Sequence, residues 1–190
     1  MRLILASASP RRLDLLARIG VEVAAVDPAE IDETPFPAES PADYARRIAA
    51  AKAVAVAPRH GGEVVLAADT VVAVGRRILP KAADIAEVAV CLKLLAGRRH
   101  RVLSAVTVID AQGVARHRLS TSIVAFGPLS AATIQAYAES GEGIGKAGGY
   151  AIQGRAEAFV RFLSGSHSGV VGLPLFETRA LLLTAGITLG

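Results

Sequence analysis

The sequence has very few of the residues that build disulfide frameworks, zinc sites or aromatic stacking surfaces. Of its 190 residues, one is a cysteine (Cys91), none is tryptophan and 4% are aromatic. A single cysteine excludes an internal disulfide framework and a cysteine-based zinc site, and it is typical of a reducing compartment. Proteins that bind single-stranded nucleic acids stack unpaired bases on aromatic side chains, and this chain has few of them. We therefore expect no nucleic-acid partner.

Long apolar runs and nucleotide-binding fingerprints are also missing. No run approaches the length that spans a membrane, and Met1-Arg2 leads directly into a strand-like segment rather than a signal peptide. The glycine-rich residues 145–154 contain neither a P-loop nor a dinucleotide-binding motif. The four histidines lack metal-site spacing. We therefore predict a cytoplasmic protein without a membrane partner.

The composition is that of a globular protein, with 52% hydrophobic and 20% charged residues. The length of 190 residues predicts a single domain, residues 1–190, with two lobes around a cleft. Lysine and arginine exceed aspartate and glutamate by 21 to 17, a net charge of +4. This excess suits an anionic small molecule and is too small to indicate nucleic acid.

Strand-like and helix-like segments both occur along the chain. Apolar and β-branched runs predict strands at residues 2–6, 21–26, 63–75, 101–110, 114–126 and 158–163. Capping signals and helical periodicity predict helices at about residues 10–20, 41–57, 82–97, 130–139 and 175–185. This mixture indicates an α/β (mixed α+β) fold with a mixed sheet. We expect the site in the least regular segments, which are 27–40, 75–82 and 140–154.

The first predicted helix carries two cations where a helix favours anions. Ser9-Pro10 is a helix-start signal in which the serine can cap free N–H groups, and Arg11 and Arg12 follow in the first turn. A polyphosphate bound at this helix start would reverse the electrostatic penalty. Otherwise both arginines point to solvent or pair with acidic residues elsewhere. The apolar stripe of the helix is Leu13, Leu16 and Ile19.

Carboxylates suited to metal-dependent phosphate chemistry occur in two places. Asp69 ends the apolar run "VVLAAD", where a buried carboxylate needs a cation or several donors. The alternative is an Asp that caps a turn. Thr70 faces the opposite way if the strand continues. Glu33, beside Asp32, is either solvated or shares a divalent cation with Asp69, because bare carboxylates repel phosphate.

Two lysines and a glutamine complete the candidate set. The inward stripe predicted for residues 41–57 is Tyr44, Ile48, Ala51 and Ala55. Lys52 lies at the edge of this stripe, where its amine reaches either water or a cleft. Lys81 follows a probable turn, and Gln153 is suited to reading a base edge. His100 in "RRHR" is interpreted as part of a solvated basic turn, and Cys91 as a core residue.

Six short blocks stand out along the chain: "LASASPRR", "ESPADYARRIAAAKA", "AADTVVAV", "GRRHRV", "GKAGGYAIQG" and "VVGLPL". In their order and rough spacing they resemble the Maf family of nucleoside triphosphate pyrophosphatases, also known as septum formation proteins. The resemblance covers essentially the whole chain. It implies a mixed, largely antiparallel sheet with flanking helices in two lobes around a cleft, similar to inosine triphosphate pyrophosphatases, and a homodimer. It also implies hydrolysis of a nucleoside triphosphate to the monophosphate and pyrophosphate with a divalent metal, Mg²⁺ or Mn²⁺.

The resemblance also implies roles for particular residues. Asp69 matches the general base, and the metal ligands are expected to be Glu33 and Asp69. The residues expected around the phosphates and metal are Ser9, Arg12, Glu33, Lys52 and Lys81. Arg11, Thr70 and Gln153 match the branch that acts on dTTP and UTP. The chain departs from the usual family pattern at Pro80, Ala82, Gly145, His167 and Gly169, which concerns loop geometry more than the reaction.

The residues and the resemblance together predict a pyrophosphatase that hydrolyses dTTP and UTP, and also modified pyrimidine triphosphates. Its expected role is to remove such nucleotides from the cellular pool. One alternative is a 7-methyl-GTP pyrophosphatase of the sister branch, which differs at Arg11, Thr70 and Gln153. A second is a septum-formation regulator that binds nucleotides without catalysis. A base beside metal-held phosphates disfavours this second alternative, because a protein that only binds has no use for it.

Overall fold

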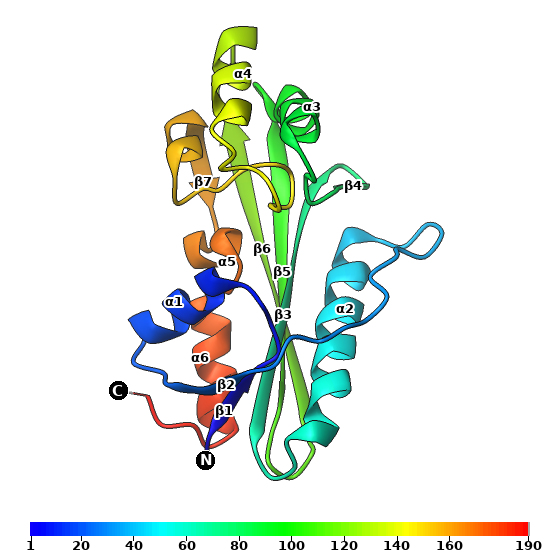
Figure 1. Ribbon diagram of the computed structural model, residues 1–190, viewed down its shortest axis with the longest axis vertical. Helices are drawn as coiled ribbons and strands as arrows, with labels where there is room; N and C mark the ends of the chain where they lie inside the picture. The colour runs from blue at the N-terminus through cyan, green and yellow to red at the C-terminus, as the bar shows by residue number, and fades with distance from the viewer. Residues whose placement is uncertain (190) are drawn as a thin grey trace.

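The computed structural model describes residues 1–189, which form a mixed α/β fold around a seven-stranded sheet (Figure 1). The strand order is β2-β1-β3-β5-β6-β7, and β4 pairs with β3 beside this path. Within the described residues β1 runs parallel to β2 and β3, and the other four pairings are antiparallel, so the expected largely antiparallel sheet is confirmed. The bounds are β1 Leu3–Leu5, β2 Val23–Val26, β3 Val64–Val74, β4 Arg77–Leu79, β5 Arg99–Ile109, β6 Ala115–Phe126 and β7 Val160–Ser164.

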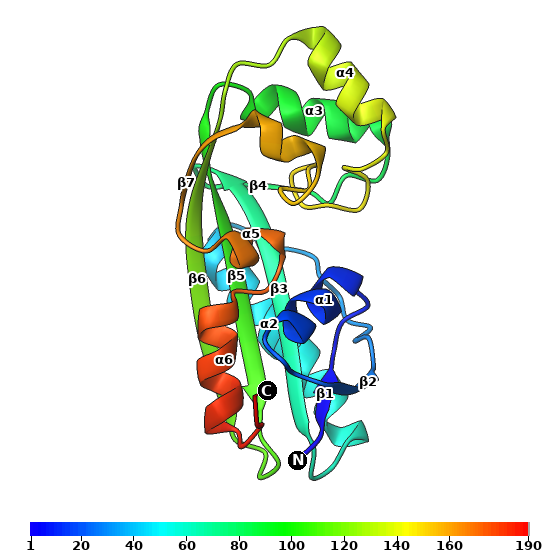
Figure 2. The same cartoon turned by 90° about the vertical axis from the view of Figure 1, so that its left-hand side faces the viewer.

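Six α-helices within residues 1–189 surround this sheet. In Figures 1 and 2, α1, α2 and α6 lie around one half of the long strands β3, β5 and β6, which we call the lower lobe. The helices α3 and α4 lie at the other end, the upper lobe. No helix in the described part of the chain has the length and apolarity needed to cross a membrane. The bounds are α1 Pro10–Arg18, α2 Pro41–Val56, α3 Ile85–Leu95, α4 Ala131–Glu139, α5 His167–Val171 and α6 Leu175–Thr184.

The strand β3 is buried on both faces, as its near-continuous apolar sequence predicts. Its side chains alternate, so Leu66 and Ala68 join a core cluster with residues of α1 and α6. Val65 and Ala67 point the other way and pack with residues of α2. The lower lobe therefore has three layers, with helices on each side of the sheet.

The partners of β3 change halfway along the strand, and this change places the cleft. Residues 64–66 pair with β1, and residues 72–74 pair with β4. Between them, residues 67–71 pair with β5 on one side, and no strand of residues 1–189 pairs with them on the other. Asp69 and Thr70 lie in this gap, so the sheet opens at a point where two adjacent polar side chains are held by a rigid strand.

The glycine-rich segment lies directly on the sheet in the upper lobe. Gly148 has a φ of +68°, and a Cβ added there would lie 2.8 Å from Val72 Cγ1. Any larger residue would therefore be strained in its backbone and would also clash with β3. A glycine at this position lets the segment approach β3 beside the gap.

Both predicted helix stripes are only partly correct: Leu16 and Ile48 are buried as expected, but each helix also buries a cation. The helix α1 buries Arg12, Leu15 and Leu16, whereas Leu13 and Ile19 of its predicted stripe are half-buried. The helix α2 buries Lys52 along with the residues Pro41, Ala45, Ile48, Ala49, Ala53 and Val56. Alanines occur all around α2, so hydrophobicity alone does not select one face. A charged residue turned inward also breaks the apolar periodicity on which the prediction depends.

Three local expectations fail in the loops and strands. His100 does not lie in a solvated turn: it is 2% exposed within β5. Ser9 begins α1 without a capping hydrogen bond from its side chain. The segments expected to be irregular contain the short strand β4, and the segment between β7 and α6 contains α5. Cys91 is buried in the core, as expected.

Candidate active site

A cavity of about 420 Å³ opens at the gap in β3, between the two lobes. A volume of this size is within the range of small-molecule sites. All of the residues that the sequence analysis predicts for substrate or metal line this cavity: Ser9, Arg11, Arg12, Glu33, Lys52, Asp69, Thr70, Lys81 and Gln153. The structure therefore brings together residues from six separate parts of the chain.

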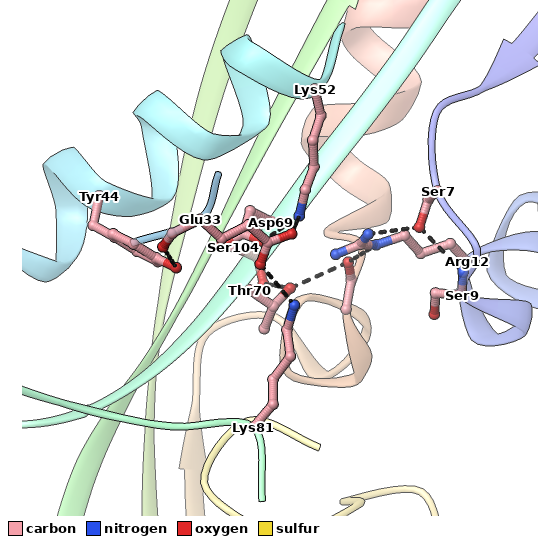
Figure 3. A network of polar contacts seen from close by, with 11 residues as sticks. Ser7, Ser9, Arg12, Glu33, Tyr44, Lys52, Asp69, Thr70, Lys81 and Ser104 are labelled. Atoms are coloured by element: carbon pink, nitrogen blue, oxygen red, sulfur yellow. Dashed lines mark hydrogen bonds and ion pairs between the residues drawn. The ribbon is translucent and has the colours of Figure 1, made fainter. Parts of the chain in front are cut away.

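A buried lysine lies between two carboxylates at the centre of the cavity wall. Lys52 Nζ is 2.9 Å from Asp69 Oδ1 and 2.7 Å from Glu33 Oε1 (Figure 3). Lys52 and Asp69 are only 8% and 3% exposed. Both charges have lost most of their water, and the ion pair compensates this loss. Of the two alternatives that the sequence left open for Lys52, the structure shows the second: its amine points into the cleft and not to bulk water.

The second lysine extends the same network toward solvent. Lys81 Nζ donates to Glu33 Oε2 at 2.9 Å, so Glu33 contacts two ammonium groups. Partial burial raises the pKa of Glu33, but the hydrogen bonds from Lys52 and Lys81 outweigh it and hold the pKa below its ordinary value. Glu33 is therefore an anion at neutral pH, and its carboxylate lies between the two lysines along the cavity wall.

The arginines of α1 occupy different environments in the same wall. Arg12 is 9% exposed, and its Nε donates to the Gly172 carbonyl oxygen at 2.9 Å. Its Nη1 donates to Ser7 Oγ at 2.8 Å. Burial lowers the pKa of Arg12, and the charges of Asp69 and Glu33 offset part of that shift. Arg11 is not directed at open solvent either, because it lines the cavity and burial lowers its pKa.

The two adjacent polar residues of β3 contact opposite sides, as the strand alternation predicts. Asp69 contacts Lys52 of α2, whereas Thr70 Oγ1 lies 2.9 Å from Ser104 Oγ on β5. Thr70 Oγ1 is also 3.3 Å from the Gly172 carbonyl oxygen, which Arg12 contacts as well. The loop after α5 therefore joins Thr70 to Arg12.

Sequence reasoning missed several groups that hold this site together. Ser7 and Ser104 are buried serines without a motif of their own, and the Gly172 carbonyl is a backbone group that no side-chain pattern reveals. Tyr44 was placed on an apolar stripe, but its hydroxyl donates to the Glu33 carbonyl oxygen at 2.8 Å. Burial, and then the charges of Asp69 and Glu33, raise the pKa of Tyr44 to about 12, so the hydroxyl keeps its proton.

A second residue of α2 fixes the acidic segment that carries Glu33. Arg47 Nε and Nη2 bind the two carboxylate oxygens of Glu39 at 2.7 and 2.8 Å. Its Nη2 also donates to the Thr34 carbonyl oxygen at 3.1 Å, and its guanidinium lies 3.9 Å from the Phe36 ring centroid. Residues 33–39 are thereby attached to α2 at several points. The helix presents Lys52 to the cavity and also holds the loop that supplies Glu33.

The donor set fits a divalent metal ion. Within residues 1–189 no three His, Cys, Asp or Glu side chains cluster as metal ligands. Glu33 and Asp69 nevertheless both reach one cationic atom, Lys52 Nζ, which shows that their oxygens converge. Mg²⁺ is commonly held by one or two carboxylates, with phosphate and water oxygens filling the remaining positions. Two carboxylates in a cation-rich cavity match that pattern.

Comparison with known proteins identifies the family. A family model described as "Maf-like protein" matches residues 2–185. The chain belongs to the Maf-like protein family. A dTTP/UTP pyrophosphatase of Sphingopyxis alaskensis is 65% identical to this Maf-like protein over 188 residues, which cover 99% of this chain and 98% of the relative. A dTTP/UTP pyrophosphatase of Rhodospirillum rubrum is 61% identical over 184 residues, covering 97% and 88% of the two chains.

A solved structure shares the fold at much lower identity. The structure of the Staphylococcus aureus Ham1 protein aligns with this Maf-like protein at a TM-score of 0.50 and 15% identity. The alignment covers 66% of this chain and 72% of the Ham1 chain. The expected mixed α/β fold thus also occurs in a distant protein.

Replacing Arg47 with alanine should release the segment of residues 33–39 from α2, because the Glu39 pair and the Thr34 bond disappear together. We expect backbone amide exchange in residues 33–39 to accelerate roughly tenfold or more, equivalent to about 1.4 kcal/mol of local stability. Hydrogen–deuterium exchange measures this directly. Arg46→Ala is the matched control, because Arg46 is exposed and its single ion pair within residues 1–189 is with Asp43, at 3.6 Å. Equal exchange rates in both variants would contradict the role given to Arg47.

Proposed function

We propose that this Maf-like protein hydrolyses nucleoside triphosphates, with dTTP and UTP as preferred substrates, to the monophosphate and pyrophosphate. The observation that carries the proposal is the cavity in which Asp69 contacts Lys52 beside the buried Arg12. Cations this close together, with a carboxylate among them, suit a bound triphosphate and an attacking water. The names of the full-length relatives support the same substrates.

Asp69 is the general base in this proposal. Its Oδ1 is fixed by Lys52 at 2.9 Å, and Figure 3 shows its carboxylate among the groups that line the cavity. In the proposed step Asp69 takes a proton from water, whose oxygen forms a bond to the α-phosphorus. The bond between the α-phosphorus and the α–β bridging oxygen breaks, and pyrophosphate leaves with the bonding electron pair.

The cationic side chains stabilise the negative charge that develops in this step. Lys52, Lys81 and Arg12 surround the position of the phosphates, and they are already held there by hydrogen bonds within the protein. Glu33 and Asp69 would hold the divalent metal, Mg²⁺ or Mn²⁺, which when bound neutralises phosphate charge as a Lewis acid. Ser9 offers a hydroxyl at the start of α1, because that group is not used for capping.

Base recognition is proposed for Arg11, Thr70 and Gln153, which all line the cavity. Gln153 presents an amide that both donates and accepts hydrogen bonds. The orientation of Thr70 is set by Ser104 at 2.9 Å. These are the positions at which the branch acting on 7-methyl-GTP differs, so they favour a pyrimidine base.

Four further properties stay predictions at this stage. We propose that residues 1–190 act as one domain, because β3, β5 and β6 run through both lobes. A homodimer and a cytoplasmic location remain expectations from the family resemblance and the composition. A nucleic-acid partner is not expected.

A panel of nucleotides tests the function. We expect pyrophosphate release from dTTP and UTP at a kcat/KM at least tenfold above that for 7-methyl-GTP, dATP and CTP, and only when Mg²⁺ or Mn²⁺ is added. Release of pyrophosphate is measured by a coupled colorimetric assay, with EDTA as the metal-free control. A preference for 7-methyl-GTP would replace the pyrimidine assignment with that of the sister branch, and binding without any hydrolysis would favour the regulatory alternative.

Asp69→Asn tests the general base. The amide keeps the size and the contact with Lys52 but accepts no proton, so kcat should fall by about 10²- to 10⁴-fold. Asp110→Asn is the control, because Asp110 is also a buried carboxylate but caps the hairpin between β5 and β6. Circular dichroism checks that both variants fold. Turnover by Asp69→Asn within threefold of the wild-type value would refute the assignment.

A further inference from the structure

A histidine outside the cavity is joined to a residue of the cavity wall. His100, at the upper end of β5, is 2% exposed and does not line the cavity. Its Nε2 is 2.8 Å from the hydroxyl oxygen of Tyr150, which does line it. The two rings pack edge to face at a centroid distance of 5.5 Å, and each also contacts Phe126 edge to face. A buried polar contact is thus enclosed by aromatic packing.

Packing alone does not account for a histidine at this position. Burial lowers the pKa of His100 to about 4, so the ring is neutral at neutral pH. Its Nδ1 has no hydrogen-bond partner among the described residues. An unpaired buried polar atom costs about 1–3 kcal/mol, which an apolar side chain of similar size would avoid. The hydrogen bond to Tyr150 is the interaction that a histidine makes here and an apolar side chain would not.

That hydrogen bond acts on the segment that faces the nucleotide. Lys146 and Gln153, on either side of Tyr150 in the chain, both line the cavity. The neighbouring Ala151 N donates to Tyr137 Oη at 3.1 Å, which gives the segment a second attachment to the upper lobe. Earlier in the segment, Ala147 forms a β-bridge with Lys81. A shift of Tyr150 would therefore move groups on two sides of the cavity.

We propose that His100 is a positioning residue: through Tyr150 it holds residues 146–153 in the conformation that binds the nucleotide. The effect on substrate binding rests on the proposed function, whereas the effect on the segment itself does not. His100 touches neither substrate nor metal in this account. It acts on KM and on the choice of base, through Gln153, rather than on the chemical step.

Three variants separate the hydrogen bond from packing. His100→Leu removes the bond but fills the space. His100→Gln retains it, because a glutamine amide offers both an oxygen that accepts and a nitrogen that donates, and either can take the place of Nε2. Phe126→Leu is the matched control, since it disturbs the same aromatic cluster and leaves both partners of the bond intact. We expect KM for UTP to rise at least fivefold in His100→Leu with kcat within threefold of wild type. His100→Gln and Phe126→Leu should stay within twofold in KM.

A double variant and an exchange measurement complete the test. Tyr150→Phe should raise KM as His100→Leu does, and the double variant should be no worse than either, because both changes break one bond. Hydrogen–deuterium exchange in residues 150–153 should accelerate in His100→Leu and Tyr150→Phe but not in Phe126→Leu. Unchanged exchange in His100→Leu, equal acceleration in Phe126→Leu, or additive losses in the double variant would each overturn the proposal. If wild-type protein hydrolyses neither dTTP nor UTP, the proposed function fails, and the exchange data alone still decide whether His100 holds the segment.

Discussion

The contact of one buried ammonium group with two carboxylates organises the cleft. Lys52 comes from α2, Asp69 from β3 and Glu33 from the acidic loop, so a single nitrogen joins three parts of the lower lobe. Lys52 and Asp69 are costly to bury alone, and breaking a buried pair costs about 3–5 kcal/mol when one charge is left unpaired. Glu33 is more exposed, and its contact with Lys52 attaches the loop to this pair, so the groups proposed for catalysis are in place before any ligand arrives.

The sheet explains why this charge cluster lies where it does. Residues 65–66 and 72–73 of β3 have strand neighbours on both sides, and the residues between them do not. Asp69 can therefore reach a cavity while its backbone stays in the ladder with β5. The upper lobe contributes further cavity-lining groups from the other side of the gap. These are Lys81, which follows β4, and the segment of residues 146–153. The strand β3 thus fixes Asp69, the proposed base, and a loop held by side-chain contacts supplies Gln153, which is proposed for base recognition.

Much of this could be predicted from the sequence, because strong local signals agreed with the fold. The apolar run through β3, the hairpin of β5 and β6, and the serine-initiated helices all occur as expected. All of the predicted site residues line one cavity. The inward faces of α1 and α2 were predicted only in part, since Arg12 and Lys52 are buried by tertiary contacts that periodicity does not encode. His100 was misplaced for a related reason: its polar neighbours in the chain are exposed, and its partner lies 50 residues away.

A crystal structure with a non-hydrolysable UTP analogue and Mg²⁺ tests the central claim most directly. The account predicts the triphosphate within roughly 3 Å of Arg12, Lys52 and Lys81, with phosphate oxygens accepting their hydrogen bonds. It also predicts that Asp69 stays beside the α-phosphate. Nucleotide density remote from these side chains, or the three cations turned outward with the cavity empty, would contradict it.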